Sequence, residues 1–116
     1  MRRRPPGVPG GDLLAGTLDM LILRILQAGP THGLRIAQAI ERRSEDVLFV
    51  EQGSLYPALY RLEDRGWIAS SWGTTDGNRR ARFYRLTPTG KRQLAAESSR
   101  WLALARAVAR VMLPES

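Results

Sequence analysis

The sequence has 116 residues, with 18 Lys and Arg, 11 Asp and Glu, one His and no Cys, so its net charge is +7. This length favours one domain, the lack of Cys excludes disulfides and thiolate metal sites, and the single His excludes a multi-His site, so no cofactor and no metal are expected. No apolar run approaches the roughly 20 residues of a membrane span, and the basic excess indicates an anionic partner, either nucleic acid or a membrane surface.

The first 13 residues combine Arg2, Arg3 and Arg4 with Pro and Gly. They contain no apolar segment of the kind found in a secretory signal. We expect residues 1–13 to form a flexible basic arm. Whether such an arm is a plain tail or touches phosphates or a minor groove is left open by the sequence.

Two helices are predicted next. The first, over about residues 14–28, has apolar residues at helical spacing and ends at Gly29-Pro30; its stripe consists of Leu18, Leu21, Ile22, Ile25 and Leu26. The second covers about residues 32–43, with Thr31 as its N-cap and with a buried side made of Leu34, Ile36, Ala37 and Ile40. The apolar run Val47–Val50 could form one short strand.

A third helix is predicted from about Ser54 to Arg65. Ser54 is a good N-cap residue, and Pro57 would then occupy the third helical position, where a missing N–H costs little. Gly66 suits the position just after the helix. Three leucines form the core stripe of this helix: Leu55, Leu59 and Leu62.

Two short strands, Trp67–Trp72 and Arg79–Leu86, flank a loop rich in Gly, Asp and Asn and predict a hairpin. Thr87-Pro88 then begins a long helix over about 88–112. Its apolar face is too broad for one small domain to bury, and we interpret it as a dimer interface. That face contains Trp101, Leu102, Leu104, Ala105, Val108 and Met112.

The expected fold is mainly α with a small β hairpin: a winged helix-turn-helix domain over residues 14–90 and a C-terminal dimerisation helix over 88–113. Residues 67–92 contain six basic residues against Asp76 alone, a net charge of +5, whereas the third helix is nearly neutral. In a winged-helix protein the third helix enters the major groove and the basic hairpin lies along the backbone. We therefore expect double-stranded DNA as the partner, contacted by Ser54, Tyr56 and Pro57 on the helix and by Arg79, Arg80 and Arg82 on the wing. For Tyr56, packing between helices is an equal alternative.

Five motifs stand in the order found in the PadR family of transcriptional regulators, which the chain resembles over residues 16–94. They are Gly16–Leu23, Gly29–Gly33, Gly53–Glu63, Gly66–Ile68 and Arg82–Gly90. The long motif Gly-Ser-Leu-Tyr-Pro-Ala-Leu-Tyr-Arg-Leu-Glu is the most specific. The single C-terminal helix resembles the short subfamily. The resemblance implies a homodimer that binds a palindromic operator, usually as a repressor, and it favours DNA contact for Ser54, Tyr56 and Arg61.

One departure is Leu34, where many members have Tyr. Some relatives bind phenolic acids or planar cationic drugs, so a small aromatic ligand stacked on a Trp is an open alternative. No arrangement of catalytic residues indicates an enzyme. A second reading is a winged-helix interaction or dimerisation adaptor that does not bind an operator. Location in the cytoplasm, on the nucleoid, is expected from DNA binding.

Overall fold

The computed structural model describes residues 11–115, with side chains described from Thr17 onward. The arm expected over residues 1–13 therefore lies mostly outside the described residues. The elements in chain order are α1 (Gly11–Leu26), β1 (Thr31–His32), α2 (Gly33–Arg43), α3 (Gln52–Asp64), β2 (Ile68–Thr74), β3 (Arg80–Leu86) and α4 (Pro88–Met112). Within residues 11–115, four helices and a small antiparallel sheet confirm the predicted mainly α fold.

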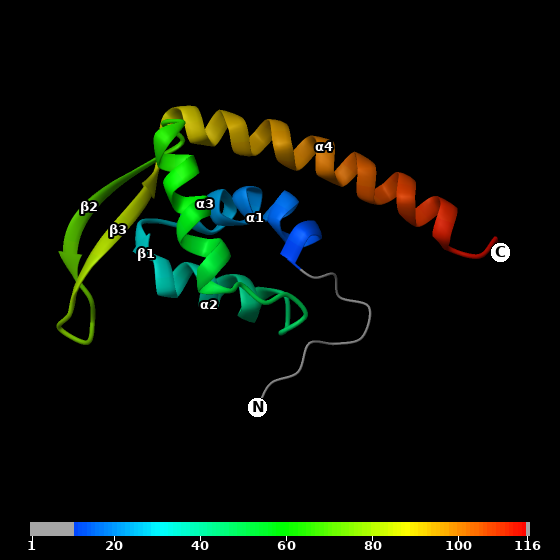
Figure 1. Ribbon diagram of the computed structural model, residues 1–116. Coiled ribbons are helices and arrows are strands. Elements are labelled where there is room, and N and C mark those ends of the chain that lie inside the picture. The colour runs from blue at the N-terminus through cyan, green and yellow to red at the C-terminus, as the bar shows by residue number, and fades with distance from the viewer. Residues whose placement is uncertain (1–10, 116) are drawn as a thin grey trace.

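The core lies between α1, α2 and α3, and the hairpin of β2 and β3 projects from one side of it (Figure 1). α4 packs against α1 near its own beginning and then extends well beyond the body of the domain (Figure 1). Among the described residues, the largest side chains that are almost completely inaccessible to solvent are Leu18, Ile22, Leu23, Ile36, Leu55, Leu59, Leu62 and Ile68. The predicted leucine stripe of the third helix is thus confirmed.

The sheet has the strand order β1-β3-β2. The hairpin pairs Ile68 with Leu86 at its base and Thr74 with Arg80 near its tip. β1 adds two residues on the other edge of β3, where Thr31 pairs with Tyr84. The sequence did not predict β1, because two residues are too few to show the alternation of a strand.

Three helix starts differ from the prediction. α1 begins at Gly11 and not at about residue 14. Thr31 belongs to β1, and His32 takes the N-cap position of α2. α3 begins at Gln52 rather than at Ser54, so Pro57 is the sixth residue of the helix and not the third. Since the N–H of residue 57 would have bonded to the carbonyl of Gly53, Pro57 removes one helical hydrogen bond. Leu34, expected on the buried side of α2, is 51% exposed.

The Val47–Val50 segment forms no strand. Glu45 and Asp46 have positive φ values of 53° and 63°, which reverse the chain after α2. The side-chain oxygen of Ser44 accepts the N–H of Leu48 at 3.0 Å, and a carboxylate oxygen of Glu41 accepts the N–H of Val50 at 3.2 Å. These backbone donors are satisfied by side chains of the preceding helix end, and a strand partner is not needed.

The junction between α3, the hairpin and α4 is tightly built. α3 ends at Asp64, and Gly66 stands just after the helix as predicted, with a φ of 77° that suits glycine. Trp67 N–H reaches back to Leu62 O at 3.0 Å. Thr87 caps α4 by accepting the N–H of Gly90 at 3.0 Å and donates its hydroxyl proton to Gly66 O at 2.7 Å. These bonds fix the direction of the wing relative to α3.

Candidate nucleic-acid interface

The wing presents arginines around an exposed tryptophan. The antiparallel register places Trp72 opposite Arg82 and Thr74 opposite Arg80, so these side chains share one face of the hairpin. The Arg80 guanidinium carbon lies 4.9 Å from the centre of the Trp72 ring, and that of Arg82 lies 5.8 Å from it. Trp72 is 59% exposed. The indole thus forms a platform that holds two cations at the surface.

Arg82 also ties the wing to α3. Its Nε donates to Ser70 Oγ at 2.8 Å, and its guanidinium lies 3.5 Å from a carboxylate oxygen of Glu63. Ser70 in turn donates to the same Glu63 oxygen. Tyr84 lies buried on the same face, and burial raises the pKa of its phenol above the usual 10.0, with the Arg82 charge opposing that rise. Part of the Arg82 charge is therefore neutralised within the protein.

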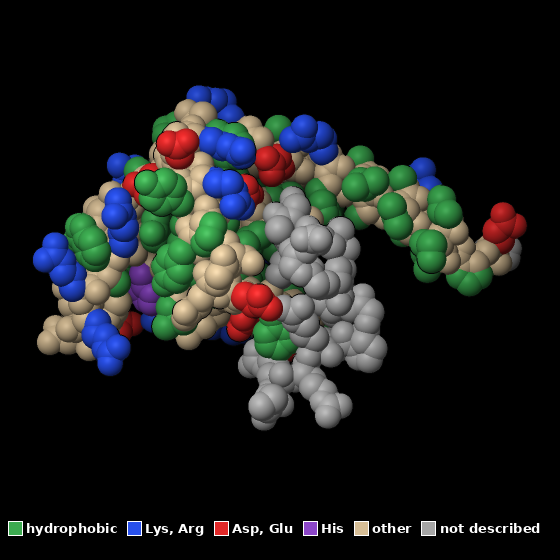
Figure 2. All heavy atoms as spheres, in the orientation of Figure 1, with side chains coloured by type: hydrophobic (Ala, Val, Ile, Leu, Met, Phe, Trp, Pro, Cys, Tyr) green, Lys and Arg blue, Asp and Glu red, His purple; other side chains and the backbone are tan. Residues whose placement is uncertain are grey.

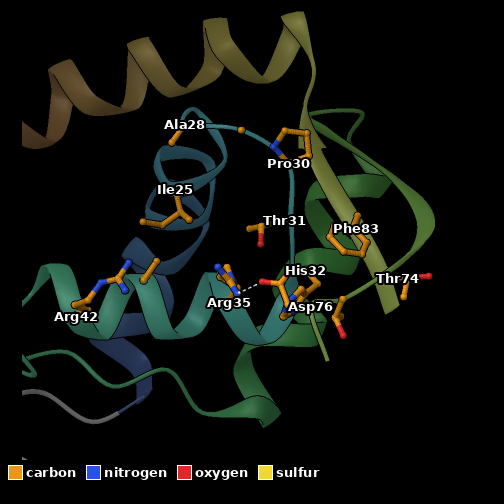
Figure 3. A pocket seen from close by; sticks show the side chains of 13 residues that line it. Ile25, Ala28, Pro30, Thr31, His32, Arg35, Arg42, Thr74, Asp76 and Phe83 are labelled. Atoms are coloured by element: carbon orange, nitrogen blue, oxygen red, sulfur yellow. Dashed lines mark hydrogen bonds and ion pairs between the residues drawn. The ribbon is translucent and has the colours of Figure 1, made fainter. Parts of the chain in front are cut away.

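The tip of the wing consists of residues 75–79, and it is exposed and anchored to α2. Asn78 adopts a left-handed φ of 61°, which Asn tolerates better than most residues, and the turn directs Arg79 and Arg80 outward. Asp76 pairs with Arg35 of α2 at 3.3 Å, across a hollow of about 390 Å³ (Figure 3). No carboxylate in the described part of the chain pairs with Arg79, which leaves its charge available.

The predicted helix residues occupy different flanks of α3. The Tyr56 ring packs against buried Gly33, whose added Cβ would lie 3.1 Å from it, yet Tyr56 stays 48% exposed. Packing and exposure thus coexist for Tyr56. Pro57 is exposed, and Ser54 is partly buried. Arg61 lies on the α1 side, where it donates to Asp19 at 2.9 Å.

A groove between α2, α3 and the wing brings several of these residues together. Its volume is about 500 Å³, and its lining includes Tyr56, Arg79, Arg80 and Arg82 of the predicted set. Ser54, Pro57 and Arg61 lie outside its lining. Figure 2 shows Lys and Arg side chains along the wing, with the His side chain in the hollow beside α3. The surface therefore combines a cationic wall with a nearly neutral helix.

Sequence reasoning missed three residues of this surface. The role of Trp72 on the wing could not be predicted, because its pairing with Arg82 depends on the strand register. The ion pair of Arg35 could not be predicted either, since it joins segments 41 residues apart. Tyr60 is 79% exposed, which the sequence alone did not indicate. Period-two alternation of the strands could have shown that Trp72 and Ser70 share a face.

Beyond its first turns α4 presents an apolar side. Trp101, Leu104, Ala105, Val108 and Met112 recur at spacings of three, four and seven residues, which aligns them along one side of the helix. Leu102 lies beside this stripe. All six are exposed or partly exposed in the single chain, and the stripe borders a hollow of about 330 Å³ next to Thr17 and Met20 of α1. A single copy of the chain does not cover this surface.

Three helices followed by a cationic hairpin define a winged helix-turn-helix protein. Residues 22–96 match the model of the transcriptional regulator PadR-like family. A transcriptional regulator of Mycobacterium tuberculosis is 38% identical over 77 residues, covering 66% of this chain and 68% of that protein. A transcriptional regulator of Clostridium thermocellum has 26% identity and a TM-score of 0.79, over 89% of this chain and 100% of the other. A PadR family regulator of Clostridium difficile has 30% identity and a TM-score of 0.73, over 84% and 100%.

The chain belongs to the PadR-like family of transcriptional regulators. It is accordingly a DNA-binding regulator and not an enzyme. Within residues 11–115, no helix is long and apolar enough to cross a bilayer. No cluster of three or more metal-ligating side chains occurs among the described residues.

Proposed function

We propose that the protein is a homodimeric repressor that binds a palindromic operator. The observation that carries this proposal is the groove in which Tyr56 of α3 faces Arg79, Arg80 and Arg82 of the wing. In this arrangement α3 enters the major groove, and the wing arginines neutralise phosphates beside it. Binding of this kind would place the protein in the cytoplasm, on the nucleoid.

Within α3 we assign the groove contacts to Ser54, Tyr56 and Pro57. Arg61 is proposed as a backbone contact. A guanidinium has five N–H donors, and the bond to Asp19 leaves others for a phosphate. The Arg61 side chain is 46% exposed, so a phosphate could reach it without breaking the ion pair.

Dimerisation is assigned to the apolar stripe of α4, which runs from Trp101 to Met112. Residues 14–90 would then form the DNA-binding unit and residues 88–113 the dimerisation helix. Two copies related by a twofold axis would place their α3 helices on half-sites about one helical turn apart. A small aromatic ligand near Trp101, where the hollow between α1 and α4 opens, is compatible with this arrangement.

The spacing of the half-sites tests the dimeric operator. The affinity of the protein is measured for three versions of a duplex that it enriches from genomic DNA. The first is the unchanged duplex, the second has five base pairs inserted between the half-sites, and the third has ten inserted. A rigid dimer should lose affinity most at five, since half a turn moves one half-site to the opposite face of the duplex. Equal binding to all three duplexes would contradict a dimer spanning a palindrome.

Repression predicts that deletion of the gene raises transcription from promoters containing these sites; a fall in transcription would indicate an activator.

An adaptor that does not bind an operator is the second candidate. Its support is that both arginines at the end of α3 lie near Asp19, at 2.9 Å for Arg61 and 4.0 Å for Arg65, so the helix offers little free positive charge. Failure of any genomic fragment to be enriched over bulk DNA would favour this alternative.

A further inference from the structure

The outward side of α3 presents two rings, those of Pro57 and Tyr60, and one charge, that of Asp64 at the end of the helix. Leu55, Ala58, Leu59 and Leu62 face the core, so the opposite side of the helix faces solvent. Tyr60 is the most exposed large side chain there, at 79%, and Pro57 lies one turn before it on the same side. In Figure 2 green hydrophobic groups lie over α3, while blue groups gather on the wing and at the upper end of the helix. Because it is so exposed, the Tyr60 ring contributes little to the stability of the fold.

Apart from Asp64, one turn further along, the charged neighbours of Tyr60 are held on the two flanks of the helix. Arg61 and Arg65 turn toward Asp19 of α1. On the other flank Glu63 accepts a hydrogen bond from Ser70 and forms an ion pair with Arg82. A shallow hollow of about 260 Å³ lies between Tyr60 and the wing and is lined by Tyr60, Glu63, Asp64 and Arg82.

This distribution of charge limits which base edges α3 can read. Recognition of guanine commonly uses a guanidinium that points into the major groove and bonds O6 and N7 together. The α3 cations in the described chain are instead directed to the α1 side. An exposed ring next to a proline offers apolar surface, and the apolar group in the major groove is the C5-methyl of thymine.

We propose that Tyr60 is a specificity-determining residue that reads a thymine methyl group in each half-site. The inference rests on the proposed function, because it requires α3 to lie in the major groove. The ring makes the contact, and the hydroxyl group is not required. A hydroxyl that bonded a phosphate would instead strengthen binding to every sequence equally.

The test uses a duplex selected from random sequence by the wild-type protein. Each thymine is replaced in turn by deoxyuridine, which removes only the methyl group. At one thymine per half-site we expect affinity to fall about fourfold, which is the change that corresponds to the transfer free energy of one buried methyl group. The same fall is expected with Tyr60→Phe. With Tyr60→Ala, thymine and deoxyuridine should bind equally, as in a double-mutant cycle that has lost its contact.

Gln27→Ala, at an exposed position at the end of α1, serves as the control and should respond as wild type does. Urea unfolding of Tyr60→Ala should match wild type, which excludes a folding defect. The inference is overturned if no thymine responds, if the response survives in Tyr60→Ala, or if Tyr60→Phe loses as much affinity as Tyr60→Ala on all sequences. If selection enriches no sequence, the proposed function fails and this inference fails with it.

Discussion

At the scale of single residues, Trp72 carries the clearest consequence for the wing. Its ring lies within 6 Å of the Arg80 and Arg82 guanidinium carbons, at 4.9 and 5.8 Å. It restricts the Arg80 side chain and adds to the contacts with Ser70 and Glu63 that already hold Arg82. Because exposed cation–π contacts are worth about 0.5–1 kcal/mol each, Trp72→Leu should weaken binding about two- to fivefold per contact on any duplex.

The dependence of affinity on salt should hardly change in Trp72→Leu, since both positive charges remain. Trp72→Phe, which keeps a ring, is the matched control and should retain most of the affinity. Fluorescence anisotropy with a selected and a shuffled duplex measures both quantities. An unchanged affinity in Trp72→Leu would show that the platform has no part in DNA binding.

A second prediction concerns the stability of the fold and is tested by a substitution at Gly90. A Cβ at this position would lie 2.0 Å from the carbonyl oxygen of Trp67, and backbone cannot yield as a side chain can. Gly90→Ala must therefore push α4 away from the hairpin base and should lower the free energy of unfolding by about 1–3 kcal/mol. Urea unfolding measures this change.

Gly53→Ala is the matched control for Gly90→Ala. Gly53 lies within α3, and apart from the adjacent residues and the backbone of its own helix no atom lies within 4 Å of an added Cβ there. Alanine is favoured over glycine in helices, so Gly53→Ala should be neutral or stabilising by up to about 1 kcal/mol. Equal destabilisation by both substitutions would mean that close packing at Gly90 is not the cause.

At the scale of elements, α4 has more apolar surface than one chain covers. Leu104 is 61% exposed and Val108 is 50% exposed, and both lie on the proposed dimer stripe. Leu104→Glu with Val108→Glu would bury two carboxylates in the interface, and we expect a monomer at micromolar concentration. Sedimentation velocity measures the oligomeric state.

Ala103→Glu is the control for that pair, because Ala103 lies on the opposite side of α4 and is exposed. It should remain a dimer. A wild-type monomer, or a dimer that survives both substitutions on the stripe, would contradict the assignment of the interface to α4.

The elements also show where the sequence was sufficient. The end of α3 and the beginning of α4 were predictable from local sequence, and the structure confirms both. Gly66 tolerates the positive φ that follows α3, and Thr87 and Pro88 cap and begin α4. β1 and the segment Val47–Val50 were not, because both depend on contacts with distant backbone or with side chains of α2. Local pattern specifies helices well, and it does not specify which short extended segment finds a partner.

The same division applies to the candidate site. The cationic wing could be located from charge alone, since Arg79, Arg80 and Arg82 follow a turn. The partial neutralisation of Arg82 by Glu63 could not, because it requires the wing to lie against α3. The exposure of Tyr60 likewise depends on how far α3 is covered by its neighbours.

At the scale of the whole molecule, the net charge of +7 should make DNA binding strongly dependent on salt. Each phosphate that an arginine neutralises releases a counterion. If a dimer contacts six to ten phosphates, affinity should fall about a thousandfold or more between 50 and 200 mM salt. Arg79→Ala with Arg80→Ala should reduce this slope and weaken binding to all sequences alike. A flat salt response would exclude the wing from the contact.

The central claim is that this protein recognises particular DNA sequences through α3 while the wing holds the backbone. The most direct measurement is an anisotropy titration of the wild-type protein at about physiological salt, with a selected duplex and with the same bases shuffled. We predict that the selected duplex binds at least about a thousandfold more tightly, with two chains per duplex. Equal affinity for the two duplexes would contradict sequence recognition and leave only nonspecific attraction between a basic protein and DNA.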